Sequence, residues 1–173
     1  MHMQLQLSHN KKQVALKSLT TTTPKEIEQK VLSSLASILN YEEVLNNDFS
    51  VRGYKLVEQP TRGQIDKALN VLAYAMTPMP LEQMEQELLK CMMVMVKPSQ
   101  ESQSDIAMRI RLIAEGLQDY PADIFLHAVK HVSKTKTFFP SLSEFRNAGE
   151  WRYQKRVKLL DMLELAQNNA QED

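Results

Sequence analysis

Apolar residues recur at three- and four-residue steps through most of the chain from residue 23 onward, which is the spacing of amphipathic helices. The first such segment is TTPKEIEQKVLSSLASILNYEEVL, where Thr23 can cap a helix, Pro24 suits its first position and Glu26 completes a capping box. Its apolar stripe consists of Ile27, Val31, Leu35, Ile38 and Leu39. These signals predict a helix that runs from Thr23 to about residue 45.

The same periodicity predicts five further helices. Thr61 and Gln64 form a second capping box, and the helix that they open ends at TPMP because proline lacks an amide donor and biases the preceding residue away from helical angles. Ser141 and Glu144 form another box, which opens a long last helix that continues to about residue 169. The helices between these two cover residues 81–97, 104–120 and 121–134.

Two segments lack this periodicity. Residues 1–22 are polar and end in a run of threonines, so they are predicted to form a mobile N-terminal arm. Residues 46–60 are rich in turn formers and then in β-formers, which predicts a connection with a short extended segment and a bend at Gly53. The predicted fold class is therefore all-α: an irregular bundle of about five to six helices, with residues 23–173 as a single helical domain.

The composition agrees with this architecture and indicates the cellular compartment. The chain has 173 residues, 43% of them hydrophobic, so it is long enough to bury a core. Its only cysteine, Cys91, stands among methionines and is predicted to be a small buried hydrophobe, which favours the cytoplasm as the compartment. Neither a membrane helix of about 18–20 apolar residues nor a signal peptide is recognisable.

Catalytic and cofactor motifs are not recognisable in the sequence. It contains no phosphate-binding loop, dinucleotide fingerprint or paired Cys/His metal pattern. His127 and His131 have the spacing that lets two imidazoles share one helix face, but a glutamate after the first histidine and a third ligand are both missing. A partly exposed histidine pair is the favoured interpretation. We expect no metal, no cofactor, no catalytic residues and no enzymatic activity.

Charge is uneven along a chain whose net charge is zero. Between residues 130 and 158 eight basic residues face two acidic ones, a local excess of six positive charges interleaved with Trp151 and Tyr153. Such a patch can bind nucleic-acid phosphates or an acidic protein surface, although a solvated helix face has the same pattern. The candidate partner- or nucleic-acid-binding residues are Lys134, Lys136, Arg146, Trp151, Arg152, Lys155 and Arg156, with Phe138, Phe139 and Pro140 setting a hinge before the last helix.

The segment YPADIFLHAVKHVSKTKTFFPSLSEF resembles a pattern in small phage and prophage replication proteins. In that pattern a helix ends in Tyr-Pro, a short helix follows, and a basic hinge leads into an aromatic-Pro-Ser helix start. The family is that of phage helicase loaders that also inhibit the replicative helicase, and the resemblance covers about residues 104–150. It implies a non-enzymatic replication adaptor that loads or restrains a helicase through protein contacts. Direct DNA or RNA binding, or inhibition of another host protein, are the alternatives.

Overall fold

The computed structural model describes residues 7–96 and 102–169, and these residues form seven helices and one two-stranded sheet. In chain order the elements are α1 (His9–Thr21), α2 (Pro24–Ala36), β1 (Tyr41–Leu45), β2 (Val51–Leu56), α3 (Arg62–Ala75), α4 (Leu81–Met93), α5 (Gln103–Gly116), α6 (Ala122–Thr135) and α7 (Leu142–Asn169). The predicted predominance of helix is confirmed. The helix count of five to six was too low, and the sheet was not expected as part of an all-α fold.

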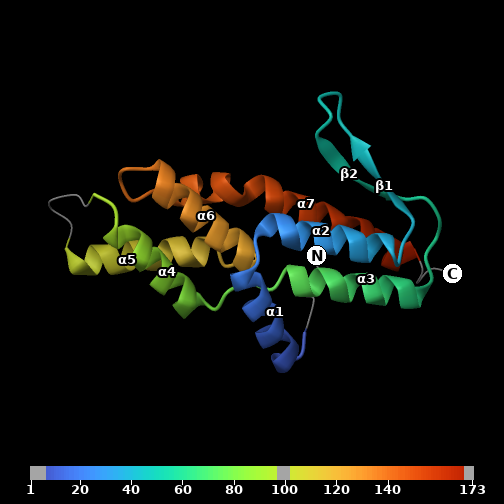
Figure 1. Cartoon of the computed structure of the whole chain (residues 1–173), viewed down its shortest axis with the longest axis horizontal. Coiled ribbons are helices and arrows are strands. Elements are labelled where there is room, and N and C mark those ends of the chain that lie inside the picture. Colours follow the sequence, from blue (N-terminus) through green and yellow to red (C-terminus); the bar gives the residue numbers. More distant parts are fainter. Residues whose placement is uncertain (1–6, 97–101, 170–173) are drawn as a thin grey trace.

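The molecule is elongated, and α7 runs along much of its length (Figure 1). Helices α2 and α3 lie beside one part of α7, whereas α4 and α5 lie side by side at the opposite end (Figure 1). Helix α6 packs against α7 and also contacts α1, α2 and α4. The largest fully buried side chains include Tyr120, Phe125 and Phe145, which come from the link between α5 and α6, from α6 and from α7. The α6–α7 contact is therefore central to the core.

Helix α1 occupies much of the segment predicted to be a mobile arm, so that prediction is wrong for residues 9–21. Ala15 and Leu19 are buried in α1, which packs against α6 and α3. Two buried positions one turn apart make too short a stripe to be recognised in a polar sequence, and contacts with distant helices stabilise the rest. Residues 1–6 of the predicted arm lie outside the described residues.

The second difference lies between α2 and α3. Helix α2 ends at Ala36 rather than near residue 45, and Tyr41–Leu45 pairs with Val51–Leu56 as an antiparallel hairpin. Gly53 is paired with Val44 inside this ladder and is not a bend. The chain reverses instead at residues 46–50, where Phe49 has a φ of 63° in the left-handed region. The hairpin projects from the helical body (Figure 1).

The predicted helix starts are confirmed. Thr23 with Glu26 and Thr61 with Gln64 form reciprocal capping boxes, so both helices begin where the sequence places them. At the start of α7, the backbone N–H and the hydroxyl of Ser141 both donate to the Glu144 carboxylate, each at 3.0 Å. Cys91 is buried as predicted, and this burial raises the pKa of its thiol.

Candidate functional site

The hinge before α7 holds its predicted residues in internal contacts. The Lys136 ammonium lies 2.7 Å from the Glu144 carboxylate, and this hydrogen bond, together with those from Ser141, lowers the pKa of Glu144 to about 2. Phe139 and Pro140 are buried, and the Phe139 ring meets the Phe145 ring edge-on at 5.8 Å. Of the predicted hinge residues only Phe138 is exposed, at 64%. The aromatic-Pro segment therefore acts mainly as a plug at the start of α7.

Arg146 also makes contacts within the protein. Its guanidinium donates to the backbone carbonyl of Gly116 and to the Asp119 carboxylate at 3.4 Å, and it lies 5.6 Å from the centre of the Tyr120 ring. The Tyr120 hydroxyl in turn donates to the Glu150 carboxylate at 2.5 Å, and the Arg146 carbonyl is a second acceptor within its reach at 3.1 Å. These contacts fasten the end of α5 to the first turns of α7.

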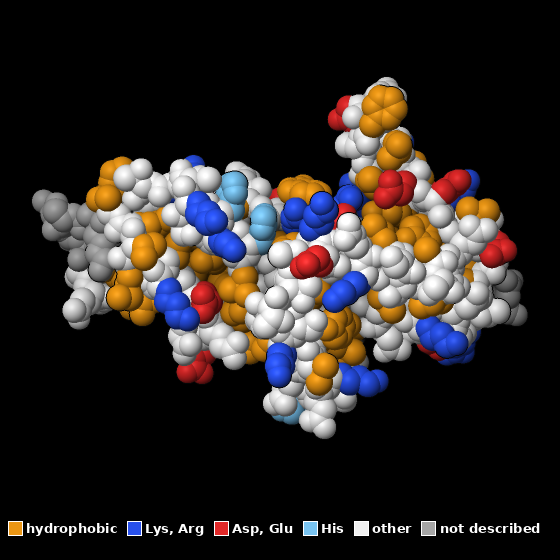
Figure 2. All heavy atoms as spheres, viewed as in Figure 1, with side chains coloured by type: hydrophobic (Ala, Val, Ile, Leu, Met, Phe, Trp, Pro, Cys, Tyr) orange, Lys and Arg blue, Asp and Glu red, His pale blue; other side chains and the backbone are white. Residues whose placement is uncertain are grey.

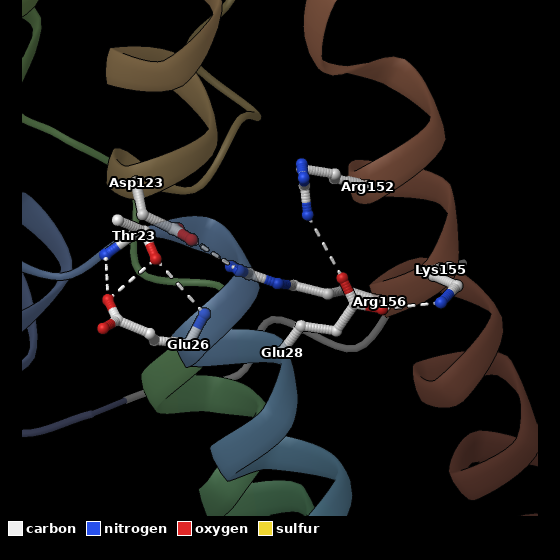
Figure 3. A network of polar contacts seen from close by, with 7 residues as sticks. All are labelled: Thr23, Glu26, Glu28, Asp123, Arg152, Lys155 and Arg156. Atoms are coloured by element: carbon white, nitrogen blue, oxygen red, sulfur yellow. Dashed lines mark hydrogen bonds and ion pairs between the residues drawn. The ribbon is translucent and has the colours of Figure 1, made fainter.

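Farther along α7, two predicted cations share one carboxylate from α2. Glu28 accepts a hydrogen bond from Lys155 at 2.6 Å and one from Arg152 at 3.4 Å, and all three side chains are mostly buried (Figure 3). The Arg152 guanidinium also lies 4.2 Å from the centre of the Trp151 ring. Trp151 is 53% exposed, so it is the predicted residue of this turn that remains accessible.

The prediction that Arg156 contacts a partner is wrong, because this side chain is buried. It donates two hydrogen bonds to the Asp123 carboxylate at 2.9 and 2.5 Å and a third to the Ala75 carbonyl at 2.6 Å (Figure 3). Asp123 is likewise buried, so this is an interior ion pair between α6 and α7. The helical period could have revealed it, since Arg156 falls in line with the buried positions Gly149 and Leu163.

Lys134 belongs to a group of basic residues on α6. His127, Lys130, His131 and Lys134 stand at steps of three and four, so they share one face of the helix. We call these four residues the basic stripe. Lys130, His131 and Lys134 are exposed, His127 is half-buried, and the two imidazoles stack with ring centres 6.4 Å apart. Figure 2 shows Lys/Arg and His side chains gathered over α6.

Charge around the stripe is positive. Burial lowers the pKa of His127, and the neighbouring charges of Arg152, His131 and Lys130 lower it further, while Asp123 acts in the opposite sense.

Within residues 7–96 and 102–169, no group of three or more His, Cys, Asp or Glu side chains is placed to hold a metal ion. None of the helices in the described part of the chain is long and apolar enough to cross a membrane.

A second surface feature was not predicted from the sequence. Seven of the thirteen large hydrophobic side chains that are exposed among the described residues lie around α4, α5 and the hinge. This group, which we call the apolar end, consists of Leu89, Met93, Val94, Val96, Met108, Leu112 and Phe138. The backbone bridge between Val96 and Phe138 holds the end of α4 against the hinge.

Two grooves flank α5 at the apolar end. The groove between α4 and α5 has a volume of about 700 Å³, with Leu89, Ile106, Ala107 and Ile110 among its lining residues. The groove between α5 and the start of α7 measures about 530 Å³ and includes Met108, Leu112, Phe139 and Leu142. In the structure Met84 and Met92 are in the core, but Met93 is 68% exposed.

The chain matches no protein-family model, no curated protein and no solved structure. The resemblance to phage helicase loaders therefore stays a prediction from residues 104–150. The structure places Arg152 over the Trp151 ring and near enough to His127 of the basic stripe for its charge to act on that residue, whereas Lys136 and Arg146 are paired with Glu144 and Asp119.

Proposed function

We propose that this protein is a non-enzymatic adaptor that binds a protein partner through the apolar end. The observation that carries the proposal is the gathering of exposed apolar side chains beside the two grooves that flank α5. Leu89 lines the α4–α5 groove, and Met108 and Leu112 line the groove between α5 and the start of α7. Contiguous exposed apolar surface on a folded protein is characteristic of interaction sites, because leaving it in water costs free energy that binding recovers.

The shape and charge of the α4–α5 groove favour an amphipathic helix as the bound element. An open groove between two helices, with aliphatic side chains inside and charged side chains at its edges, is the arrangement in which helices of partner proteins bind. Glu82 and Glu85 lie on its α4 side, and Arg111 on the α5 side already contacts Glu85 at 3.0 Å and Glu115 at 2.6 Å. We therefore expect a partner helix with basic residues on the flank that faces α4.

The resemblance of residues 104–150 supports a replicative helicase subunit as that partner, in a phage or prophage replication system in the cytoplasm. This segment includes α5 and Phe138, so it contributes three of the seven residues of the apolar end. An adaptor without a catalytic step would act by binding energy alone. It would load or restrain the helicase by binding one conformation of the ring more tightly than another and so shifting their populations.

A charge placed in the apolar end tests this function. Leu89→Glu with Ala107→Glu, at two exposed residues that line the α4–α5 groove, should reduce affinity for the purified replicative helicase at least 100-fold in calorimetry or surface plasmon resonance, because two carboxylates would have to be desolvated in the interface. The control is Leu165→Glu on α7, an exposed leucine outside the apolar end, which should bind as the wild type does.

Circular dichroism and thermal unfolding should show that both variants keep the wild-type fold, because Leu89, Ala107 and Leu165 are exposed. Wild-type affinity in the double variant would contradict the proposed interface. Capture of a different host protein that is lost in the double variant, with no helicase binding, would favour the inhibitor alternative over the helicase.

A further inference from the structure

The basic stripe on α6 is a separate feature that the adaptor function does not use. No hydrogen bond or ion pair engages the ammonium groups of Lys130 and Lys134 within the described residues, and both side chains are exposed. By contrast, each arginine and lysine predicted as a contact on α7 has an internal partner. The uncompensated positive charge of the carboxy-terminal part of the chain therefore lies mainly on α6.

The carboxylates nearest to the stripe cannot neutralise it. Asp123 is the only acidic residue of α6, and it is buried in its ion pair with Arg156. Glu28 lies beside Arg152 and is shared between Arg152 and Lys155. Lys130 and Lys134, one turn apart, thus present an unscreened pair of positive charges about 6 Å apart along the helix axis, given the rise of an α-helix.

Aromatic surface adjoins these cations. Arg152 lies between the basic stripe and Trp151. Its guanidinium lies over the Trp151 ring, and its positive charge acts on His127 of the stripe. About half of Trp151 is exposed, and the stacked imidazoles of His127 and His131 add two flat rings. Cations that contact phosphates, beside rings on which bases stack, are the combination that single-stranded nucleic acid requires.

We propose that the basic stripe and Trp151 bind single-stranded nucleic acid, with Lys130 and Lys134 contacting phosphates and Trp151 stacking on a base. A duplex fits the geometry less well. A helix that reads a duplex enters the major groove, whereas α6 packs against α7, α1 and α4 and cannot project. An acidic protein surface could also pair with the lysines, and competition with an acidic peptide distinguishes this alternative from nucleic acid.

Binding of a fluorescently labelled oligothymidine of about 20 nucleotides, followed by anisotropy over a salt series, tests the proposal. The wild-type protein should bind at low salt. The logarithm of its affinity should fall with the logarithm of salt concentration with a slope near −1.4, about −0.7 for each of two phosphate contacts. Lys130→Glu with Lys134→Glu should lose at least tenfold in affinity and most of this slope.

Two matched variants separate phosphate contacts from stacking and from general charge. Lys11→Glu with Lys12→Glu makes the same charge change on two exposed lysines of α1 and should bind as the wild type does. Trp151→Ala should weaken binding about tenfold with the slope unchanged, since a lost stacking contact releases no counterion. Leu89→Glu with Ala107→Glu should leave oligonucleotide affinity unchanged, so this test and that of the adaptor function fail independently.

Four outcomes would overturn the proposal: no binding at low salt, equal losses in the α1 and α6 variants, tighter binding of a duplex of the same length, or undiminished affinity of Trp151→Ala. A polyglutamate peptide that displaces the oligonucleotide at equal charge concentration would also overturn it, by assigning the stripe to an acidic protein surface. Circular dichroism of each variant confirms that the comparison is made between folded proteins.

Discussion

Helices α6 and α7 both look basic in the sequence, but they use their positive charges differently. On α7 the cations Arg146, Arg152, Lys155 and Arg156 all contact carboxylates of their own chain. On α6 Lys130 and Lys134 stand free at the surface of the described structure. A run of basic residues therefore measures the charge of a segment and not the charge that a partner would meet.

The difference follows from where the two helices lie. Helix α7 contacts α6, α3 and strand β2, so its cations meet groups of several other elements, including Glu28 on α2 and Asp123 on α6. Partly desolvated charges persist only when they are paired, which favours such partners on every side of a central helix. The outer face of α6 meets solvent, where lysines need no partner.

The largest expected effect comes from the buried pair. Arg156→Ala should destabilise the protein by about 3–5 kcal/mol, because it leaves Asp123 as an unpaired charge in the interior. Urea unfolding followed by circular dichroism measures the loss. The matched control is Lys134→Ala on the exposed face of α6, which should change stability by about 0.5 kcal/mol or less.

A second control separates the pair from the packing around it. Replacing both partners by apolar residues, Asp123→Leu with Arg156→Met, should recover a large part of the stability lost in Arg156→Ala. A loss below about 1 kcal/mol in Arg156→Ala, the range of exposed ion pairs, would show that the pair is solvated and would remove the contrast between α6 and α7.

Close packing of α7 on α6 predicts the next effect. A Cβ on Gly149 would lie 2.8 Å from Tyr120 Cε2 and 2.9 Å from Ile124 Cγ2, so Gly149→Ala should destabilise by about 1–3 kcal/mol through overpacking. Gly63→Ala in α3 meets no atom within 4 Å and should stabilise by about 0.4–1 kcal/mol. Thermal unfolding of both variants checks the opposite signs, and equal signs would contradict the close contact of the helices.

Local sequence signals predicted the helices that carry their own caps and stripes. Thr23, Thr61 and Ser141 mark helix starts because a capping box is formed by residues three positions apart, without help from the rest of the fold. Helix α1 and the hairpin were missed for the opposite reason. Leu19 and Tyr54 are buried against elements distant in sequence, and such contacts override weak local preferences.

For the candidate site, too, the sequence predicted local features and missed those that depend on contacts between distant residues. The excess of basic residues near the carboxy-terminal end is visible in the sequence, but pairing with Glu28 or Asp123 joins residues that are 127 or 33 positions apart in the chain. No local pattern encodes such a pair. The apolar end was missed because helical spacing does not reveal which apolar positions remain without a covering element, as Met108 and Leu112 do.

Removing the carboxylate that pairs with two cations of α7 should leave unpaired positive charge on that helix, as on α6. Glu28→Gln leaves Arg152 and Lys155 without their carboxylate, so stability should fall by about 1 kcal/mol. Oligonucleotide affinity should rise a few-fold, with a salt slope more negative by up to about 1.4 if both cations contact phosphates. The control is Glu85→Gln, which removes a contact of Arg111 on α5 and should leave nucleic-acid binding unchanged.

The smallest predicted effect is on the pH dependence of stability, and it comes from His127 on α6. His127 has a lowered pKa in the folded protein, so between this pKa and the ordinary value of about 6.5 the unfolded chain binds more protons. Its contribution to stability is therefore present above about pH 6.5 and is lost as the pH falls through the folded-state pKa. Urea unfolding at a series of pH values from about 8 to 5 should show a shallower decline for His127→Gln than for the wild type. Parallel declines would mean that neither the burial of His127 nor the positive charges near it lower the pKa of this histidine in the folded protein.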